Sequence, residues 1–213
     1  MYTILHLGLG SFHRAHQAVY LHQLRQRGDT RWSITGGNLR PDMLETIAAL
    51  QAQNGRYTLE TVTPQGERSY TVIESIQRVI SYQDDLEPLI AAGADPATRI
   101  ISFTVTEAGY YLDDKNRLDW ATFPDLRADL DAVKAGQAGH TIYGGLVSIL
   151  RARMHANAGP VTLMNCDNLR HNGERSRGGL LQFIDALGDV VLKDWVQENT
   201  RSPNAMVDRI TPR

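Results

Sequence analysis

The most informative stretch of the sequence is Ile4-Leu-His-Leu-Gly-Leu-Gly-Ser-Phe-His-Arg-Ala-His16, where the apolar run Tyr2–Leu7 meets Gly8 and Gly10. A segment with a helical pattern, Arg14–Gln26, follows at once. A strand that turns through glycines into a helix brings backbone N–H groups and the positive end of the helix dipole to one point, which suits a pyrophosphate. His13 stands where the usual G-x-G-x-x-G pattern has its third glycine. This stretch alone therefore fits a dinucleotide site and a simple tight turn about equally well.

The composition excludes several classes of protein. The 213 residues are 42% hydrophobic and 22% charged with a net charge of −2, so no basic excess indicates nucleic acid. No apolar run approaches the ~20 residues of a membrane span, and the start lacks the charged and apolar regions of a secretory signal. One cysteine, Cys166, excludes an internal disulfide and a Cys-rich zinc site. We expect a cytoplasmic protein without nucleic-acid or membrane partners.

Apolar runs alternate with helical patterns along the chain. The expected strands are Tyr2–Leu7, Trp32–Thr35, Ile100–Val105 and Val161–Asn165, and the expected helices are Arg14–Gln26, Pro41–Gln53, Ile142–Ala156, Leu180–Leu187 and Val190–Glu198. Between them, Tyr57–Val62 and Ser69–Ile73 flank a turn-rich segment and predict a β-hairpin. This alternation predicts an α/β fold with a mostly parallel sheet, helices on both faces and a hairpin insertion.

Three polar loops follow predicted strands: Gly8–His16, Thr106–Tyr111 and Asn165–Gly173. Ligands of open α/β sheets bind beyond the carboxyl ends of the strands, near the point where the strand order reverses. Three such loops at one edge are stronger evidence for a binding site than one pair of glycines. We therefore expect the functional site at this edge of the sheet.

The loop after the middle strand carries Thr106 and Glu107, which leave a buried strand together. A partly desolvated carboxylate at Glu107 could accept or relay protons, and a helix cap or loop hydrogen bond explains it as well. Near the end of the chain, Asp208 and Arg209 form either a structural ion pair or part of the same pocket.

The loop after the late strand is crowded with short polar side chains, namely Asn165, Asp167, Asn168, His171 and Asn172. Such a loop can simply satisfy its own turns. At a carboxyl edge it can instead place an asparagine amide against a substrate hydroxyl or a developing oxyanion.

The end of the second strand is where an acidic residue binds the adenosine ribose of NAD. This chain has Asn38 there, with Arg40 and Asp42 beyond it. Asp42 suits the ribose hydroxyls, whereas Arg40 suits a 2′-phosphate. The residues favour NAD as the cofactor and leave NADP open.

Two other patterns are weaker. His13 and His16 share a helix face, but no third ligand type completes a metal site, so we expect none. Tyr111 and Lys115 match the Tyr-x-x-x-Lys pair of short-chain dehydrogenases, which requires a helix. Asp113 and its neighbours read as an exposed turn instead, so we interpret this match as accidental.

Four motifs in this order resemble the mannitol dehydrogenase family of long-chain, metal-independent polyol dehydrogenases. They are Gly8-Leu-Gly-Ser-Phe-His-Arg-Ala-His-Gln17, Thr104-Val-Thr-Glu-Ala-Gly-Tyr110, Asn165-Cys-Asp-Asn-Leu-Arg-His-Asn-Gly173 and Asn204-Ala-Met-Val-Asp-Arg-Ile-Thr-Pro212. The resemblance implies a Rossmann-type, doubly wound NAD(P)-binding domain over residues 1–213. It implies reversible hydride transfer between NAD and a sugar polyol or ketose, first D-arabinitol to D-xylulose and next D-mannitol to D-fructose.

The resemblance also implies roles for individual residues. Gly8, Gly10, Phe12 and His13 match the family's cofactor loop, and Val207 and Asp208 match its substrate pocket. We expect Leu9 and Ser11 in the same loop, and Arg209 in the same pocket. The further cofactor contacts that we expect are Asn38, Arg40, Asp42, Thr106 and Asn168. Asn168 matches an asparagine that stabilises the alkoxide, and Glu107 matches a glutamate associated with proton movement.

The family's catalytic lysine lies in a helical C-terminal domain, within a Lys-x-x-x-x-Asn-x-x-His pattern that these 213 residues lack. We therefore expect this chain to be the cofactor-binding half of such an enzyme, inactive without the helical domain. The alternative is a non-catalytic nucleotide-binding or regulatory module.

Overall fold

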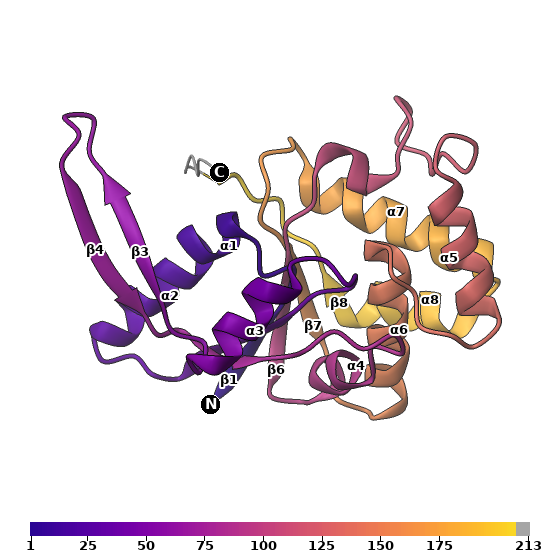
Figure 1. The fold of residues 1–213 in the computed structure, drawn as a ribbon. Helices are drawn as coiled ribbons and strands as arrows, with labels where there is room; N and C mark the ends of the chain where they lie inside the picture. The colour runs from indigo at the N-terminus through magenta and orange to yellow at the C-terminus, as the bar shows by residue number, and fades with distance from the viewer. Residues whose placement is uncertain (208–213) are drawn as a thin grey trace.

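A computed structural model describes residues 1–207 and contains a six-stranded, wholly parallel sheet (Figure 1). Its strands are β1 (Tyr2–Leu7), β2 (Trp32–Gly37), β5 (Ile76–Val79), β6 (Thr98–Phe103), β7 (Val161–Asn165) and β8 (Thr200–Arg201). The spatial order is β5-β2-β1-β6-β7-β8. Without the hairpin strands, this is the 3-2-1-4-5-6 order of the dinucleotide-binding Rossmann fold, so the predicted fold class is confirmed.

Helices cover both faces of the sheet (Figure 1). They are α1 (Ser11–Ala15), α2 (Gln17–Gln26), α3 (Leu44–Ala52), α4 (Glu87–Ala94), the 3₁₀ helix η1 (Glu107–Tyr110), α5 (Pro124–Lys134), α6 (Ile142–His155), α7 (Asn172–Leu187) and α8 (Val190–Asn199). Strand β1 shows how the faces divide, because Ile4 packs in the core under α2 and α3 while Leu5 and Leu7 pack in the core under α4 to α8. Within residues 1–207, none of the helices has the length and apolar character of a membrane span.

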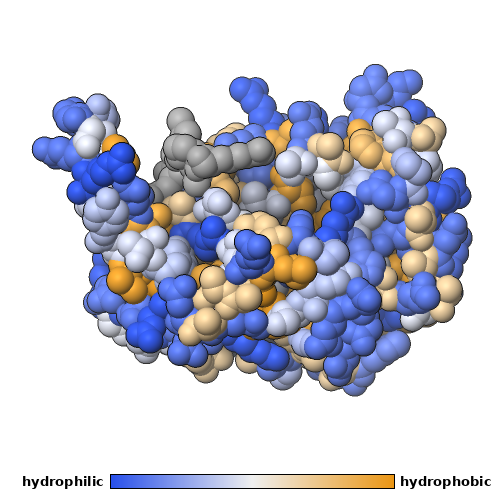
Figure 2. All heavy atoms as spheres, in the orientation of Figure 1, coloured by the Kyte–Doolittle hydropathy of each residue, from blue (hydrophilic) through white to orange (hydrophobic). Residues whose placement is uncertain are grey.

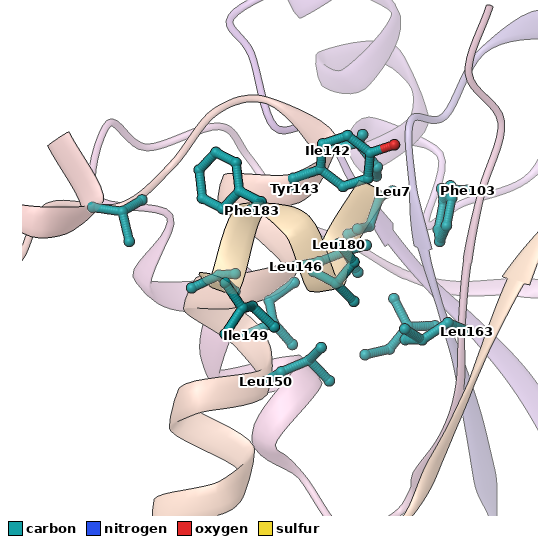
Figure 3. Close-up of a cluster of buried hydrophobic side chains, with 14 of the residues drawn as sticks. Leu7, Phe103, Ile142, Tyr143, Leu146, Ile149, Leu150, Leu163, Leu180 and Phe183 are labelled. Atoms are coloured by element: carbon teal, nitrogen blue, oxygen red, sulfur yellow. The ribbon is translucent and has the colours of Figure 1, made fainter. Parts of the chain in front are cut away.

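The larger core fixes the carboxyl edge of the sheet (Figure 3). Helix α6 presents Ile142, Leu146 and Leu150, spaced four residues apart, and the last two are at most 1% exposed. They meet strand side chains such as Phe103 and α7 side chains such as Phe183. Full burial of each large apolar side chain contributes roughly 1.5–3 kcal/mol, so this interface anchors the strand ends on which the loops sit.

The hairpin consists of β3 (Tyr57–Val62) and β4 (Arg68–Ile73), paired antiparallel from Tyr57↔Ile73 to Val62↔Arg68. Gly66, with φ +86°, lies in its turn. The hairpin enters between α3 and β5 and projects away from the sheet, and Figure 2 shows it standing clear of a largely hydrophilic surface. The predicted hairpin is therefore confirmed.

Three predicted helices have different limits. The helix expected over Leu180–Leu187 begins earlier, at Asn172, as α7. The expected helix Arg14–Gln26 is two helices, because His16 (φ −123°, ψ −96°) leaves the helical region between α1 and α2. The helix expected from Pro41 begins only at Leu44, because Met43 adopts a left-handed conformation (φ 57°). Strands β5 and β8 and helices α4 and α5 were not predicted from the sequence.

Candidate functional site

The glycine loop after β1 leaves open space at the carboxyl edge. Gly8 has φ +103°, a conformation that favours glycine, and a Cβ at Gly8 or Gly10 would have no atom within 4 Å. The Leu9 N–H donates to Asn38 Oδ1 (2.9 Å), which holds the loop in place. No side chain caps the N-terminus of α1. The first N–H groups of a helix lack intrahelical partners, so an anionic group lying against this backbone would find donors.

An imidazole pair stands in place of the third glycine. The His6 and His13 rings stack at 3.5 Å with an interplanar angle of 15°, and they are 0% and 2% exposed. A glycine at this position usually lets the helix pack closely on the strand. Here the contact between α1 and β1 is made by the stacked rings of His13 and His6. This is the physical reason why the loop departs from the usual pattern.

Both rings are neutral in the folded protein. Burial lowers the pKa of His6 to about 3 and lowers the pKa of His13 well below its ordinary value. His6 Nε2 lies 3.0 Å from the Gly8 carbonyl oxygen, which can only accept, so Nε2 carries the proton, and Nδ1 lies 2.8 Å from Ser102 Oγ. His6 thus ties the glycine loop to strand β6.

The His13 ring nitrogens, in contrast, have no hydrogen-bond partner among residues 1–207. Buried polar atoms are nearly always paired, so an unpaired imidazole beside an open glycine loop fits a site that a polar ligand completes. The open space at Gly8 and Gly10 and the unpaired ring of His13 both fit a dinucleotide.

The loop after β2 places the three ribose candidates differently. Asn38 is buried, and its Nδ2 donates to the Asp42 carbonyl oxygen (3.0 Å), so its amide holds two loops together. The Arg40 guanidinium donates to Tyr111 Oη (2.8 Å) and to Asp125 Oδ2 (3.2 Å). Asp42 is exposed. Arg40 and Asp42 are thus both exposed, and the Arg40 guanidinium is held by hydrogen bonds to Tyr111 and Asp125.

The loop after β6 brings Thr106 and Glu107 to the same edge, and both are exposed. Glu107 borders a hollow of about 230 Å³ together with Tyr110, Leu169 and Arg175. The sequence suggested a partly desolvated carboxylate, whereas the structure leaves Glu107 in contact with solvent. Its carboxylate nevertheless lies beside the loop that follows β7.

That third loop divides into buried and exposed members. Asn165, Asp167 and Asn172 are at most 8% exposed and bond within the protein, as the structural interpretation of the cluster predicts. Asn168 and His171 are exposed. Asn168 is thus the amide of this loop that can donate to a substrate, as the alternative interpretation predicts.

Tyr111 and Lys115 do not form a catalytic pair. The segment is a turn, with the Lys115 N–H donating to Asp113 Oδ1 (2.9 Å), and Lys115 is exposed. Burial raises the pKa of Tyr111 to about 12, the opposite of what a tyrosine acid–base catalyst needs. The interpretation of this match as accidental is confirmed.

The chain returns to the site at its end. The Ala205 N–H donates to Asn172 Oδ1 (2.9 Å), which ties the segment just before Val207 to the third loop. Asp208 and Arg209 lie outside the described residues. Within residues 1–207, no group of three His, Cys, Asp or Glu side chains is placed to hold a metal ion.

Comparison with known proteins matches residues 2–213 to the family model described as the mannitol dehydrogenase Rossmann domain. The chain belongs to this family. Its D-arabinitol 4-dehydrogenase relative from Klebsiella pneumoniae is 55% identical over 212 residues, covering 100% of this chain and 45% of that protein. The mannitol 2-dehydrogenase of Cereibacter sphaeroides is 41% identical, covering 98% of this chain and 43% of that protein.

A solved structure of the same family has a closely similar fold. Pseudomonas fluorescens mannitol 2-dehydrogenase, in a ternary complex with NAD and D-mannitol, superposes with a TM-score of 0.88 at 38% identity, over 99% of this chain and 42% of that one. The chain thus spans somewhat under half the length of the relatives it matches.

Sequence reasoning missed several residues of the site. Ser102 and Gln17 belong to the same buried cluster as His6, since Ser102 Oγ lies 2.9 Å from Gln17 Oε1. The signal available in the sequence was a polar residue within an apolar strand, such as His6 or Ser102. Both are 0% exposed in the structure. Tyr110 is buried beneath the third loop and gave no such signal.

Proposed function

We propose that this chain is the NAD-binding domain of a polyol dehydrogenase, which transfers hydride between NAD and a secondary alcohol of a sugar polyol. The observation that carries the proposal is the open glycine loop at the β1/β6 switch point, in a chain 55% identical along its whole length to a D-arabinitol 4-dehydrogenase. The proposed reaction is D-arabinitol to D-xylulose. D-mannitol to D-fructose is the competing reaction, because mannitol 2-dehydrogenases are also similar.

The proposed cofactor site has three parts. The pyrophosphate is held by the backbone of Gly8 to His13, and the adenosine ribose lies at Asn38 and Asp42. Thr106 and Asn168 contact the nicotinamide end. When bound, NAD supplies the hydride acceptor. NAD is favoured over NADP because Arg40, although exposed, donates to Asp125 and Tyr111, and the exposed Asp42 offers a carboxylate to the ribose hydroxyls.

The residues of this chain have limited roles in the chemistry. Asn168 donates a hydrogen bond from its amide to the reacting oxygen, and Glu107 carries a proton between the site and solvent, as its exposure permits. Val207, with Asp208 and Arg209, contributes to the polyol pocket.

We propose that the general base comes from a C-terminal domain. The relatives are more than twice as long as this chain, and no Lys-x-x-x-x-Asn-x-x-His pattern occurs in the 213 residues. The second domain also orients the polyol and excludes water from the site.

Calorimetric titration of NAD into the chain tests the cofactor site. Gly10→Val should bind NAD at least about tenfold more weakly, because its side chain fills the space in which the pyrophosphate lies. Gly10 has φ −69°, and a Cβ there meets no atom within 4 Å, so the variant should fold normally.

The matched control is Gly178→Ala in α7, which also adds its Cβ in open space and lies outside the three loops. It should bind NAD as the wild type does. Equal NAD affinity in wild type and Gly10→Val would place the cofactor elsewhere. A polyol panel assayed on the full-length protein then identifies the substrate, and preference for a phosphorylated polyol would contradict the proposal.

A further inference from the structure

A buried polar network joins the loops that carry Glu107 and Asn168. Tyr110, the last residue of η1, is 2% exposed and donates from its hydroxyl to Asp167 Oδ2 (2.7 Å). Asn165 at the end of β7 donates from Nδ2 to the Tyr110 hydroxyl oxygen (2.7 Å). Asp167 directly precedes Asn168, and Tyr110 follows Glu107 by three residues. One hydroxyl therefore connects both loops.

The same carboxylate holds the loop from its other side. Asp167 Oδ1 accepts from the Leu169 N–H (3.2 Å) and from Asn172 Nδ2 (3.3 Å), so the carboxylate of the residue before Asn168 is bonded to two residues that follow it. Asn172 Oδ1 accepts in turn from the Ala205 N–H (2.9 Å). The segment that leads to Val207 is thus fixed to the same network.

Tyr110 is itself held rigidly. The Tyr143 hydroxyl donates to the Tyr110 carbonyl oxygen (2.8 Å), and Tyr143 is 0% exposed within α6. Burial, and then the bond to Asp167, raise the pKa of Tyr110, so its hydroxyl stays a proton donor throughout the working pH range.

We propose, on the basis of the proposed function, that Tyr110 and Asp167 are positioning residues that fix the Asn168 amide for the reacting oxygen. Asn168 is exposed on a loop between β7 and α7, where side chains are mobile unless their neighbours are held. The hydrogen bond from a phenol to a carboxylate is of the strong, charge-assisted kind.

The test compares kcat for NAD-dependent polyol oxidation in the full-length protein. Asn168→Ala should lower kcat by about 10²-fold, as expected for loss of one donor to the reacting oxygen. Tyr110→Phe should lower kcat by about tenfold while the Kd for NADH stays within about twofold, because a small misplacement of a reacting group costs rate rather than cofactor binding. Asp167→Asn should behave as Tyr110→Phe does, because an amide cannot accept all the hydrogen bonds that the Asp167 carboxylate accepts.

The decisive variant is the double change Tyr110→Phe with Asn168→Ala. Because Tyr110 acts through Asn168, its tenfold effect should vanish in the Asn168→Ala background, while its effect on Tm should remain. Thr98→Val is the control, since it removes a buried hydroxyl that donates to the Ala92 carbonyl oxygen (2.7 Å), away from the three loops. It should lower Tm without changing kcat.

Equal loss of kcat from Tyr110→Phe in both backgrounds would overturn the inference, as would an unchanged kcat in both Tyr110→Phe and Asp167→Asn. A wild-type protein that oxidises no polyol would overturn the proposed function and this inference with it. The two failures are distinguishable because the first leaves wild-type activity intact.

Discussion

At the scale of single residues, the His6–His13 pair replaces a glycine by a different solution to the same packing problem. The stacked rings let α1 pack on β1, and burial keeps both imidazoles neutral. Both ring nitrogens of His6 have a hydrogen-bond partner, while the ring nitrogens of His13 have none within residues 1–207. The pair therefore makes stability sensitive to pH.

For both histidines the folded pKa lies below the ordinary value of 6.5. The unfolded chain then binds more protons than the folded one below about pH 6.5. Stability is complete above that pH and is lost as pH falls, by about 1.4 kcal/mol per pH unit for each histidine. His13→Phe keeps a stacked ring but removes one titrating group, so urea unfolding from pH 6 to pH 4.5 should show a slope smaller by one proton. Equal slopes would contradict the neutral, buried state of His13.

At the scale of elements, Asp129 joins α5 to the start of α6. Its carboxylate accepts from the His140 and Thr141 N–H groups and from the Thr141 hydroxyl, and Thr141 caps α6 by accepting from the Gly144 N–H (3.1 Å). A side chain at Gly144 would overlap Asp129 Oδ2. Glycine is needed there for a close approach and not for its backbone freedom.

Two helical glycines should therefore respond oppositely to alanine. Gly144→Ala should destabilise the protein by about 1–3 kcal/mol, because the new methyl group displaces the Asp129 carboxylate. Gly178→Ala adds its methyl group in open space and should stabilise by about 0.5–1 kcal/mol. Urea unfolding of both variants checks the pair, and a stabilising Gly144→Ala would refute the role assigned to Asp129.

The elements also show what the sequence could predict. Apolar β-branched runs and the turn at Gly66 predicted the central strands and the hairpin, because local pattern and tertiary position agree there. Helix α4 was missed although Pro88 lies in its first turn; its N-cap Leu86 adopts a left-handed conformation (φ 53°), which the sequence does not signal. Helix α5 had a usable signal, namely Pro124 in its first turn and buried Leu126, Leu130 and Val133 along one face.

At the scale of the whole molecule, the parallel sheet explains why loops as far apart in the sequence as Gly8–His16 and Asn165–Gly173 meet at one edge. The rule that ligands bind beyond the carboxyl ends of parallel strands predicted that these loops meet, and it placed all three correctly. The same rule did not predict which side chains of these loops face solvent. The burial of Asp167 and Asn172 depends on Tyr110 and Ala205, which come from other parts of the chain. Contacts of this kind are fixed by tertiary packing and leave no local pattern.

The same arrangement limits what these 213 residues can catalyse on their own. Removal of hydride from a secondary alcohol leaves an oxygen whose proton must be taken away, and general-base catalysis of such a step is typically worth ~10²–10⁴-fold. Asn168 donates at most a hydrogen bond, and Lys115 lies in an exposed turn.

We therefore expect the 213-residue chain to bind NAD but to oxidise D-arabinitol at least about 10²-fold more slowly than the full-length protein. The rate of NADH formation at high protein concentration, measured for the short chain and for the full-length protein, checks the difference in activity. Tyr111→Phe and Lys115→Ala are the comparison variants. Robust activity of the short chain that both variants abolish would transfer the chemistry to the Tyr111–Lys115 pair, against the raised pKa of Tyr111 and its bond to Arg40.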